Sequence, residues 1–179
     1  CMISIYILEG IRFYVSFACS WAFAELKQME GNAKIIKLIC RDENTHLSAS
    51  LNIIRTLIKE DKDFVKIKEE TDTQVMELFE ECLVQEEEWC DYLFGAGSMI
   101  GLNAELLKEY VRWIGAKRIK SLGYTVPFHT HMHNPLPWTE KWISGGNVQV
   151  APQETEITSY VVGGVKQDVN KKSFEGLSL

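Results

Sequence analysis

Several features that mark common protein classes are missing from this sequence. The cysteines are odd in number and form no C-x-x-C pair, so neither a disulfide framework nor a structural zinc site is expected. An excess of positive charge is also missing: the net charge is −6, whereas proteins that bind nucleic acid regardless of its sequence usually present a basic face. We therefore expect free thiols, a reducing cytoplasmic location, and no DNA or RNA partner.

The sequence also lacks an apolar run of the length that a membrane span needs. Its most apolar stretch, residues 13–24, is shorter than the roughly 20 residues required to cross a bilayer, and Glu9 and Arg12 lie directly upstream. We expect no membrane segment. An apolar run follows Cys1 and Met2 at once, without a polar leader, so we expect the chain to begin inside a helix, part-way along a longer protein.

The features that are present describe a helical protein with one core. Hydrophobic residues make up 46% of the 179 residues, which is enough for a single domain. The spacing of apolar residues predicts helices over residues 2–28, 33–58, 64–94 and 103–122, with a solvated connector at 59–63. The first helix is apolar around its circumference, as a buried helix is. Beyond Gly123 all four prolines occur, which predicts irregular structure and then a flexible C-terminal tail.

One pair of residues has the spacing of a metal-binding motif. Glu43 and His46 are three positions apart in a predicted helix, so their side chains share a face and point at a common volume. On its own, a Glu-x-x-His pair is more often part of a solvated surface than of a metal site.

Glu9 strengthens the metal interpretation. Its neighbours in the first predicted helix are apolar and are expected to be buried: Ile5, Leu8, Ile11, Phe13, Val15 and Phe17. An unpaired carboxylate in such surroundings would cost several kcal/mol. Its partner is either an arginine, Arg12 or Arg41, or a bound cation.

Together these residues match half of a known ligand pattern. Di-iron carboxylate bundles take one Glu from each of two helices and a Glu-x-x-His pair from each of two others. This sequence has one of each, Glu9 and Glu43 with His46, on consecutive helices. Carboxylates and imidazole suit iron or manganese. No second Glu-x-x-His occurs, and the remaining histidines alternate in a proline-flanked segment where we expect loop residues: His129, His131 and His133.

Longer stretches closely resemble the small, radical-generating subunit of class I ribonucleotide reductase. They are residues 8–17 (LEGIRFYVSF), 29–36 (MEGNAKII), 41–46 (RDENTH), 92–94 (YLF) with 97–103 (GSMIGLN), 134–138 (NPLPW) and 147–154 (NVQVAPQE). The resemblance covers essentially the whole chain and corresponds to the C-terminal half of that subunit. It implies an all-α, ferritin-like di-iron carboxylate helical bundle, present in part over residues 1–142, and a tail at 143–179 that docks on the large catalytic subunit.

The resemblance also implies roles for single residues. Glu9, Glu43 and His46 would be ligands to the second iron of a di-iron centre that reacts with oxygen and leaves a tyrosyl radical. The apolar pocket around that radical would be lined by Phe13, Phe17 and Ile39.

Two further residues would belong to the path that carries the radical. Asp42 would hydrogen-bond a histidine ligand of the other iron, and Tyr160 in the tail would relay the radical toward the large subunit. The family's other ligands and its radical tyrosine have no counterpart in this chain. We therefore expect the chain to assemble a complete site only if a missing N-terminal half is supplied by another polypeptide.

The implied function is that of one component of ribonucleoside-diphosphate reductase. Its homodimeric small subunit would supply the radical for reducing ribonucleotides to deoxyribonucleotides, the precursors of DNA, and would have no substrate-binding residues. Two other interpretations stay open at this point. A ferritin-like iron-storage protein would have no need of a tail bearing Tyr160. A non-catalytic helical interaction fragment would have Glu9 and Glu43 neutralised by Arg12 and Arg41, and its folding would not depend on metal.

Overall fold

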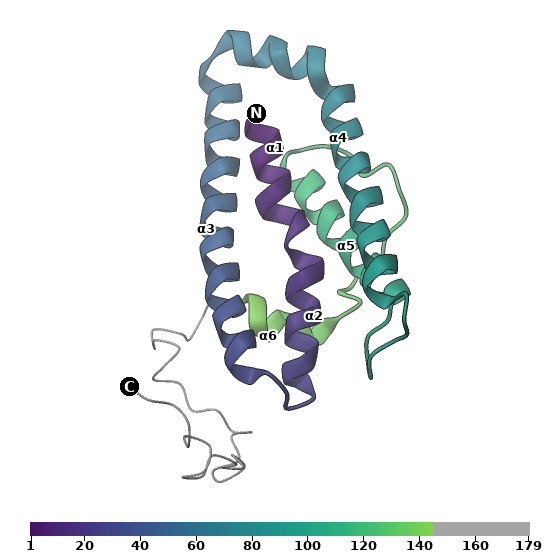
Figure 1. Ribbon diagram of the computed structural model, residues 1–179. Coiled ribbons are helices and arrows are strands. Elements are labelled where there is room, and N and C mark those ends of the chain that lie inside the picture. Colours follow the sequence, from purple (N-terminus) through teal and green to yellow (C-terminus); the bar gives the residue numbers. More distant parts are fainter. Residues whose placement is uncertain (145–179) are drawn as a thin grey trace, which may run out of the picture.

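The computed structural model describes residues 1–144, which form a bundle of long helices (Figure 1). The elements are α1 (Met2–Ile7), the π-helical turn η1 (Leu8–Arg12), α2 (Tyr14–Glu25), α3 (Glu30–Glu60), α4 (Lys62–Phe94), α5 (Ala104–Ser121), the 3-10 turn η2 (Pro137–Thr139) and α6 (Glu140–Ile143). No β-strand occurs in this part of the chain. The all-α prediction is therefore confirmed for the described residues.

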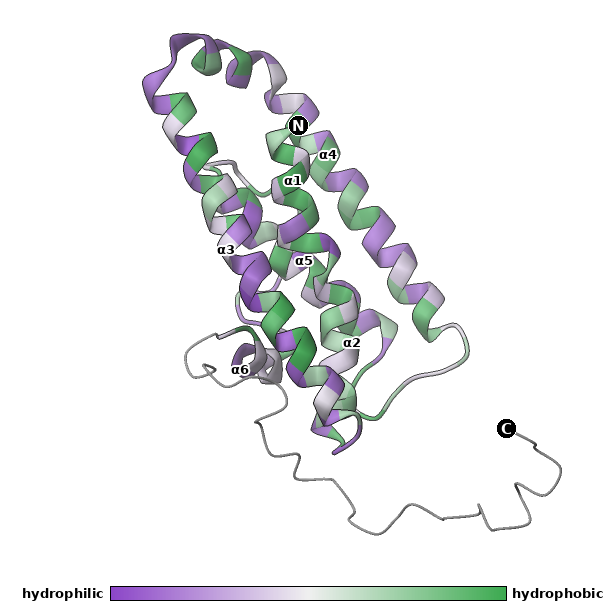
Figure 2. Ribbon diagram, turned by 60° about the vertical axis from the view of Figure 1, so that its left-hand side comes forward, coloured by the Kyte–Doolittle hydropathy of each residue, from purple (hydrophilic) through white to green (hydrophobic). Residues whose placement is uncertain are grey.

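One rod runs through the middle of the bundle. It consists of α1, η1 and α2 in continuous succession, with α3 and α4 on either side and α5 behind it (Figure 1). Its side chains Tyr6, Ile11, Tyr14 and Trp21 are buried, which explains why this segment is apolar on most sides. The two flanking helices instead alternate between hydrophobic and hydrophilic residues along their length (Figure 2), as helices with one solvated face do.

The rod contains a turn that the sequence did not predict. Between residues 8 and 12 the helix widens from α to π geometry, and regular α-helix resumes at Tyr14. Such single π-turns inside α-helices are uncommon and are frequently found at functional sites. Here the π-turn includes Glu9, the candidate metal ligand.

The other helix boundaries differ from prediction mainly at one connector. The predicted connector at 59–63 is exposed, as expected, but it is shorter than predicted, because α3 continues to Glu60 and α4 begins at Lys62. Asp61 alone makes the break: its backbone is extended, and its side chain accepts a hydrogen bond from the amide of Asp63 at 2.9 Å. The predicted N-cap at Asn103 is confirmed, since its side chain accepts from the amide of Leu106.

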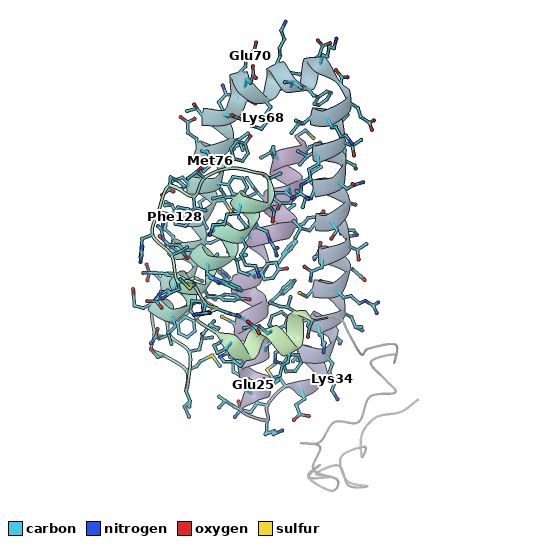
Figure 3. The ribbon with its side chains drawn as sticks, turned by 180° about the vertical axis from the view of Figure 1, so that it is seen from behind. Glu25, Lys34, Lys68, Glu70, Met76 and Phe128 are labelled. Atoms are coloured by element: carbon cyan, nitrogen blue, oxygen red, sulfur yellow. The ribbon has the colours of Figure 1, made fainter. Side chains whose placement is uncertain are left out.

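The segment after α5 is irregular, as expected from its prolines, and the three histidines lie in it. The short helix α6 was not predicted, and it is held against the end of α2. Glu25, labelled in Figure 3, accepts hydrogen bonds from Lys141 at 2.8 Å and from the Trp142 indole at 2.9 Å. Trp142 also stacks on Trp21, with 6.1 Å between the ring centroids. The five cysteines are free thiols.

Two expectations about the rod are corrected. Ile11, Val15 and Phe17 are buried as predicted and Phe13 is half-buried, but Ile5 and Leu8 are exposed, because no described element covers that side of the rod. The continuous helix of residues 2–25 is also long and apolar enough to span a membrane, which the shorter stretch at 13–24 had not suggested. This segment bears Glu9 and Arg12, and several of its apolar side chains, among them Ile11, Val15 and Trp21, are buried in the core of the bundle.

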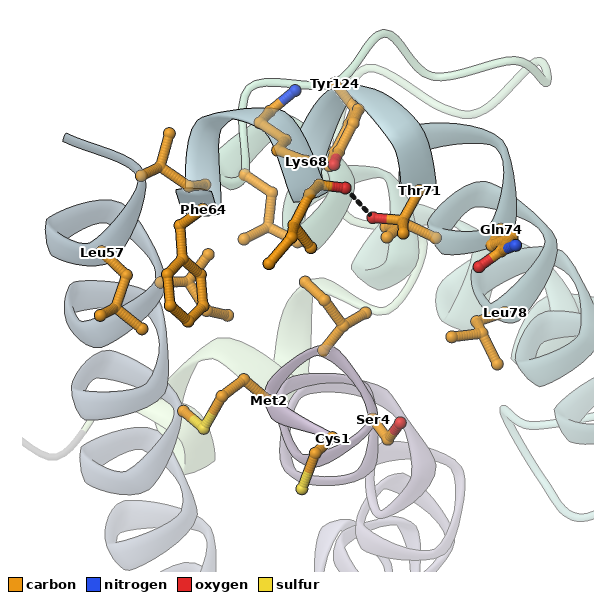
Figure 4. Close-up of a pocket in the computed structure, with 16 residues that line it drawn as sticks. Cys1, Met2, Ser4, Leu57, Phe64, Lys68, Thr71, Gln74, Leu78 and Tyr124 are labelled. Atoms are coloured by element: carbon orange, nitrogen blue, oxygen red, sulfur yellow. Dashed lines mark hydrogen bonds between the residues drawn. The ribbon is translucent and has the colours of Figure 1, made fainter. Parts of the chain in front are cut away.

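A cavity of about 490 Å³ lies at the start of α1, between the end of α3 and the beginning of α4 (Figure 4). Its lining is predominantly apolar and includes Met2, Leu57 and Phe64. Lys68 is the one lysine or arginine among the described lining residues, and it pairs with Asp72 at 3.1 Å. The cavity therefore offers no cluster of cations for a nucleotide phosphate, and it does not include the candidate metal ligands.

Candidate metal centre

Glu9, Glu43 and His46 come together in space. One potential ligand atom from each lies within 4.8 Å of the other two, and these residues are the one such cluster of His, Cys, Asp and Glu in residues 1–144. The imidazole Nδ1 of His46 lies 3.2 Å from a carboxylate oxygen of Glu9 and 3.2 Å from one of Glu43. The lone carboxylate thus comes from η1 in the rod, and the Glu-x-x-His pair comes from α3, which follows the rod in the sequence.

The polar atoms of this cluster are not fully satisfied by the protein. Nδ1 of His46 has hydrogen-bond geometry toward Glu43, whereas Oε2 of Glu9 is buried and has no hydrogen-bond partner despite its short distance to the imidazole. The hydrogen bond to Glu43, reinforced by the charge of Glu9, raises the pKa of His46. A cation held by all three groups would take the place of that proton and would satisfy the orphaned oxygen.

The donor set indicates which metals fit. Two carboxylates and one imidazole, without thiolate, suit iron or manganese. The side chains of Glu9 and Glu43 are 19% and 17% exposed, while His46 is 58% exposed. The site is therefore lined by protein on one side and open on the other, as expected if other side chains complete it.

The alternative partner for Glu9 within the rod is engaged elsewhere. Arg12 donates to the Gln85 side chain at 2.6 Å and lies 3.7 Å from the Glu86 carboxylate, both on α4. This pairing ties the end of the π-turn to α4 and leaves Glu9 facing His46. The sequence left a salt bridge between Glu9 and Arg12 as one possibility, but in the structure Arg12 contacts Gln85 and Glu86 instead.

The residues expected to line the radical pocket and to form the radical path lie in different surroundings. Phe13 and Phe17 follow Glu9 along the rod and stack on each other, with 5.8 Å between ring centroids. Ile39, one turn before Glu43 on α3, is 40% exposed. Asp42 is solvent-exposed, with Arg41 3.6 Å away. Tyr160 lies outside the described residues.

Sequence reasoning missed the residue that connects the two elements carrying the candidate ligands. Arg118 on α5 donates to the Gly10 carbonyl and to the Tyr14 hydroxyl, which in turn donates to Asn44 on α3. Burial raises the pKa of Tyr14 to about 12, so the phenol keeps its proton at neutral pH. A signal was present: Arg118 follows the apolar positions Ile114 and Gly115 at helical spacing, and a cation on a buried face needs a partner.

Comparison with known proteins agrees with this geometry. The family model for "Ribonucleotide reductase, small chain" matches residues 1–135. The chain is 47% identical over 181 residues to a ribonucleoside-diphosphate reductase subunit beta of Haemophilus influenzae, covering 100% of this chain and 48% of that protein. The corresponding protein of Salmonella typhimurium is 47% identical over 182 residues with the same coverage.

A solved structure gives the same result for the fold. The ribonucleotide reductase R2 subunit from Clostridium botulinum superposes with a TM-score of 0.73 at 28% identity, covering 79% of this chain and 44% of that one. The helices described above are therefore part of the ferritin-like bundle of that family, as the sequence predicted. The chain spans about half the length of the curated relatives that it matches. By the match over residues 1–135 and these likenesses, the chain belongs to the ribonucleotide reductase small-chain family.

Proposed function

We propose that this chain supplies one half of the di-iron site in the small subunit of a class I ribonucleoside-diphosphate reductase. The observation that carries the proposal is the convergence of Glu9, Glu43 and His46 within 4.8 Å, with a buried Glu9 oxygen that lacks a hydrogen-bond partner. One Glu and one Glu-x-x-His pair are half of the ligands that a di-iron bundle uses. Iron is the proposed metal, and manganese is the alternative.

The surface around these ligands supports the need for a second half. Ile5 and Leu8 on the rod and Ile35 and Ile39 on α3 are large apolar side chains that remain exposed. Ile5 and Ile39 each lie one turn before a candidate ligand, so exposed apolar side chains flank the site on both elements. Apolar surface of this kind marks an interaction site, and the rest of the small subunit is its proposed occupant.

Each residue then has a defined task in the completed subunit. When bound, the metal pair would supply the oxidising chemistry with oxygen that generates a tyrosyl radical on the other half. Glu9 and Glu43 would neutralise the metal charge through their carboxylates, and His46 would bind through the nitrogen that now faces them. Phe13, Phe17 and Ile39 would keep water away from the radical.

The route out of the site is assigned to Asp42 and Tyr160. Asp42 precedes the ligand Glu43 and exposes its carboxylate, so a histidine from the missing half could donate to it. Tyr160 would pass the radical on, with the tail of residues 143–179 docking on the large subunit. We propose that the enzyme acts in the cytoplasm, that its small subunit is a homodimer, and that substrate binds to the large subunit alone.

Reconstitution tests this function. This chain, the remaining half of the small subunit and the large subunit are mixed with ferrous iron and oxygen, and the reduction of ribonucleoside diphosphates is measured. Turnover is expected only when all parts are present, and Glu9→Gln should abolish it. Glu69→Gln, at an exposed position on α4, is the control and should retain turnover. Full turnover in Glu9→Gln would contradict the proposal, and association of the halves without metal binding would favour the helical interaction fragment.

A further inference from the structure

Arg118 on α5 contacts the rod before, within and after the π-turn. Its own carbonyl accepts a hydrogen bond from the Tyr6 hydroxyl on α1 at 3.2 Å. Its Nε donates to the Gly10 carbonyl inside η1 at 3.0 Å, and its Nη2 donates to the Tyr14 hydroxyl at the start of α2 at 3.1 Å. The guanidinium also lies over the Tyr14 ring, 5.4 Å from its centroid. One residue outside the rod therefore spans the whole distorted segment.

The bond to Gly10 matters because of the π geometry. A π-turn interrupts the regular ladder of bonds between residues four apart, so its carbonyls become accessible to donors from outside the helix. Gly10 also allows the donor to come close: a Cβ at this position would lie 3.3 Å from Arg118 Nε and 2.9 Å from the Leu47 side chain. Gly10 directly follows Glu9, so fixing its carbonyl fixes the backbone that carries the ligand.

A second side-chain hydrogen bond of Arg118, to the Tyr14 hydroxyl, leads on to α3, the helix that carries Glu43 and His46. The Tyr14 hydroxyl that accepts from Arg118 donates to the Asn44 side chain on α3 at 3.0 Å. Asn44 lies between the ligands Glu43 and His46 in the sequence. The guanidinium thus connects to the backbone beside Glu9 through one bond and to the helix of the other two ligands through two.

We propose that Arg118 is a positioning residue that sets the distance between Glu9 and the Glu43–His46 pair. It touches none of the three ligands, and it acts through Gly10 on one side and through Tyr14 and Asn44 on the other. Arginine suits this task because its planar fork donates in two directions at once, which a lysine ammonium on a flexible stem does not reproduce. The effect on metal binding rests on the proposed function, whereas the effect of Arg118 on the stability of η1 can be measured without any metal.

The test uses Arg118→Met in the full chain and Arg112→Met as the matched control. Arg112 lies on the same helix and is also paired, but with Glu87 on α4 at 2.9 Å. The first readout is hydrogen exchange of the amides in residues 8–13 without metal. The second is the affinity for Mn²⁺, measured with the rest of the small subunit present from the paramagnetic resonance signal of the free ion.

Arg118→Met should speed exchange in η1 by about tenfold or more, with little change in the middle of α4, because local opening becomes easier. It should weaken Mn²⁺ binding by about 10- to 100-fold, the usual effect of losing a residue that orients metal ligands. Arg112→Met should change the exchange rate in η1 and the affinity for Mn²⁺ by less than about twofold. Tyr14→Phe removes the hydrogen bonds of the Tyr14 hydroxyl to Arg118 and Asn44 but keeps the bond from Arg118 to Gly10. It should weaken Mn²⁺ binding while leaving exchange in η1 close to that of the wild type.

The outcomes distinguish the positioning role of Arg118 from the proposed metal-binding function. Unchanged η1 exchange in Arg118→Met, or equal acceleration throughout the bundle in both arginine variants, overturns the positioning role. If Arg118→Met does not fold, Arg118→Lys serves instead, and wild-type behaviour in that variant also overturns it. If the wild-type protein binds neither Mn²⁺ nor Fe²⁺, the proposed function is contradicted, while the exchange data still decide whether Arg118 holds η1 in place.

Discussion

Replacing the buried carboxylate Glu86 with glutamine should stabilise the fold at neutral pH and have little effect in acid. The Glu86 side chain is only 8% exposed, and its Oε2 has no hydrogen-bond partner in the described structure. Burial raises its pKa from 4.5 to about 7, although the nearby Arg12 guanidinium opposes the shift. The other titratable groups beside it are thiols on its own helix, Cys82 and Cys90, whose pKa values it helps to raise.

The sign follows from where the proton binds. Below about pH 4.5 Glu86 is protonated in the folded and the unfolded chain, and it resembles the amide. As the pH rises toward 7, the unfolded chain releases this proton before the folded chain does, so the folded state loses stability. One pH unit corresponds to about 1.36 kcal/mol, which makes the expected loss on the order of 3 kcal/mol by pH 7.5. Glutamine at this position avoids that loss.

Urea unfolding of the wild type and of Glu86→Gln, measured from pH 4.5 to 8, tests this reasoning. The difference in unfolding free energy should be small at pH 4.5, should grow in favour of the variant, and should level off above about pH 7. Glu88→Gln, an exposed position on the same helix, is the control and should stay within about 0.5 kcal/mol throughout. A difference that is flat with pH, or that favours the wild type at pH 8, would refute the account.

Three further predictions concern the core and the tail. Trp21→Ala removes a fully buried side chain and should lower the unfolding free energy, measured by calorimetry, by about 3–5 kcal/mol. Met132 is exposed, so Met132→Ala should change this free energy by less than about 0.5 kcal/mol. Tyr160→Phe should leave metal loading and radical formation intact while abolishing turnover; retained turnover would remove the relay role. A peptide of residues 160–179 should compete with the complete small subunit for the large subunit, and a lack of competition in a binding assay would exclude the tail as the docking element.

The cluster of candidate ligands could be predicted from the sequence because much of its arrangement depends on local geometry. Glu43 and His46 are one helical turn apart, so their common face follows from helical periodicity alone. Glu9 was identified because a carboxylate in an apolar helix needs a partner. The structure places all three in one cluster, and the long helices on which this depends also follow from the apolar spacing.

The features that were missed depend on contacts between segments far apart in the chain. The π-turn at residues 8–12 is held by Arg118 of α5 and, through Arg12, by side chains of α4, and no local pattern encodes those partners. The exposure of Ile5 and Leu8 depends on what covers the rod, which periodicity within the rod cannot reveal. The short helix α6 is fixed by its hydrogen bonds to Glu25, more than a hundred residues earlier.

The most direct test of the central claim is an electron paramagnetic resonance spectrum recorded after ferrous iron and oxygen are added. The spectrum is taken for this chain alone, for the remaining half of the small subunit alone, and for the two together. A tyrosyl radical signal is expected only in the mixture, and it should disappear when the mixture contains His46→Ala. A radical formed by either half alone, or no radical in a mixture whose halves are shown to associate, would contradict the assignment of Glu9, Glu43 and His46 to a shared metal site.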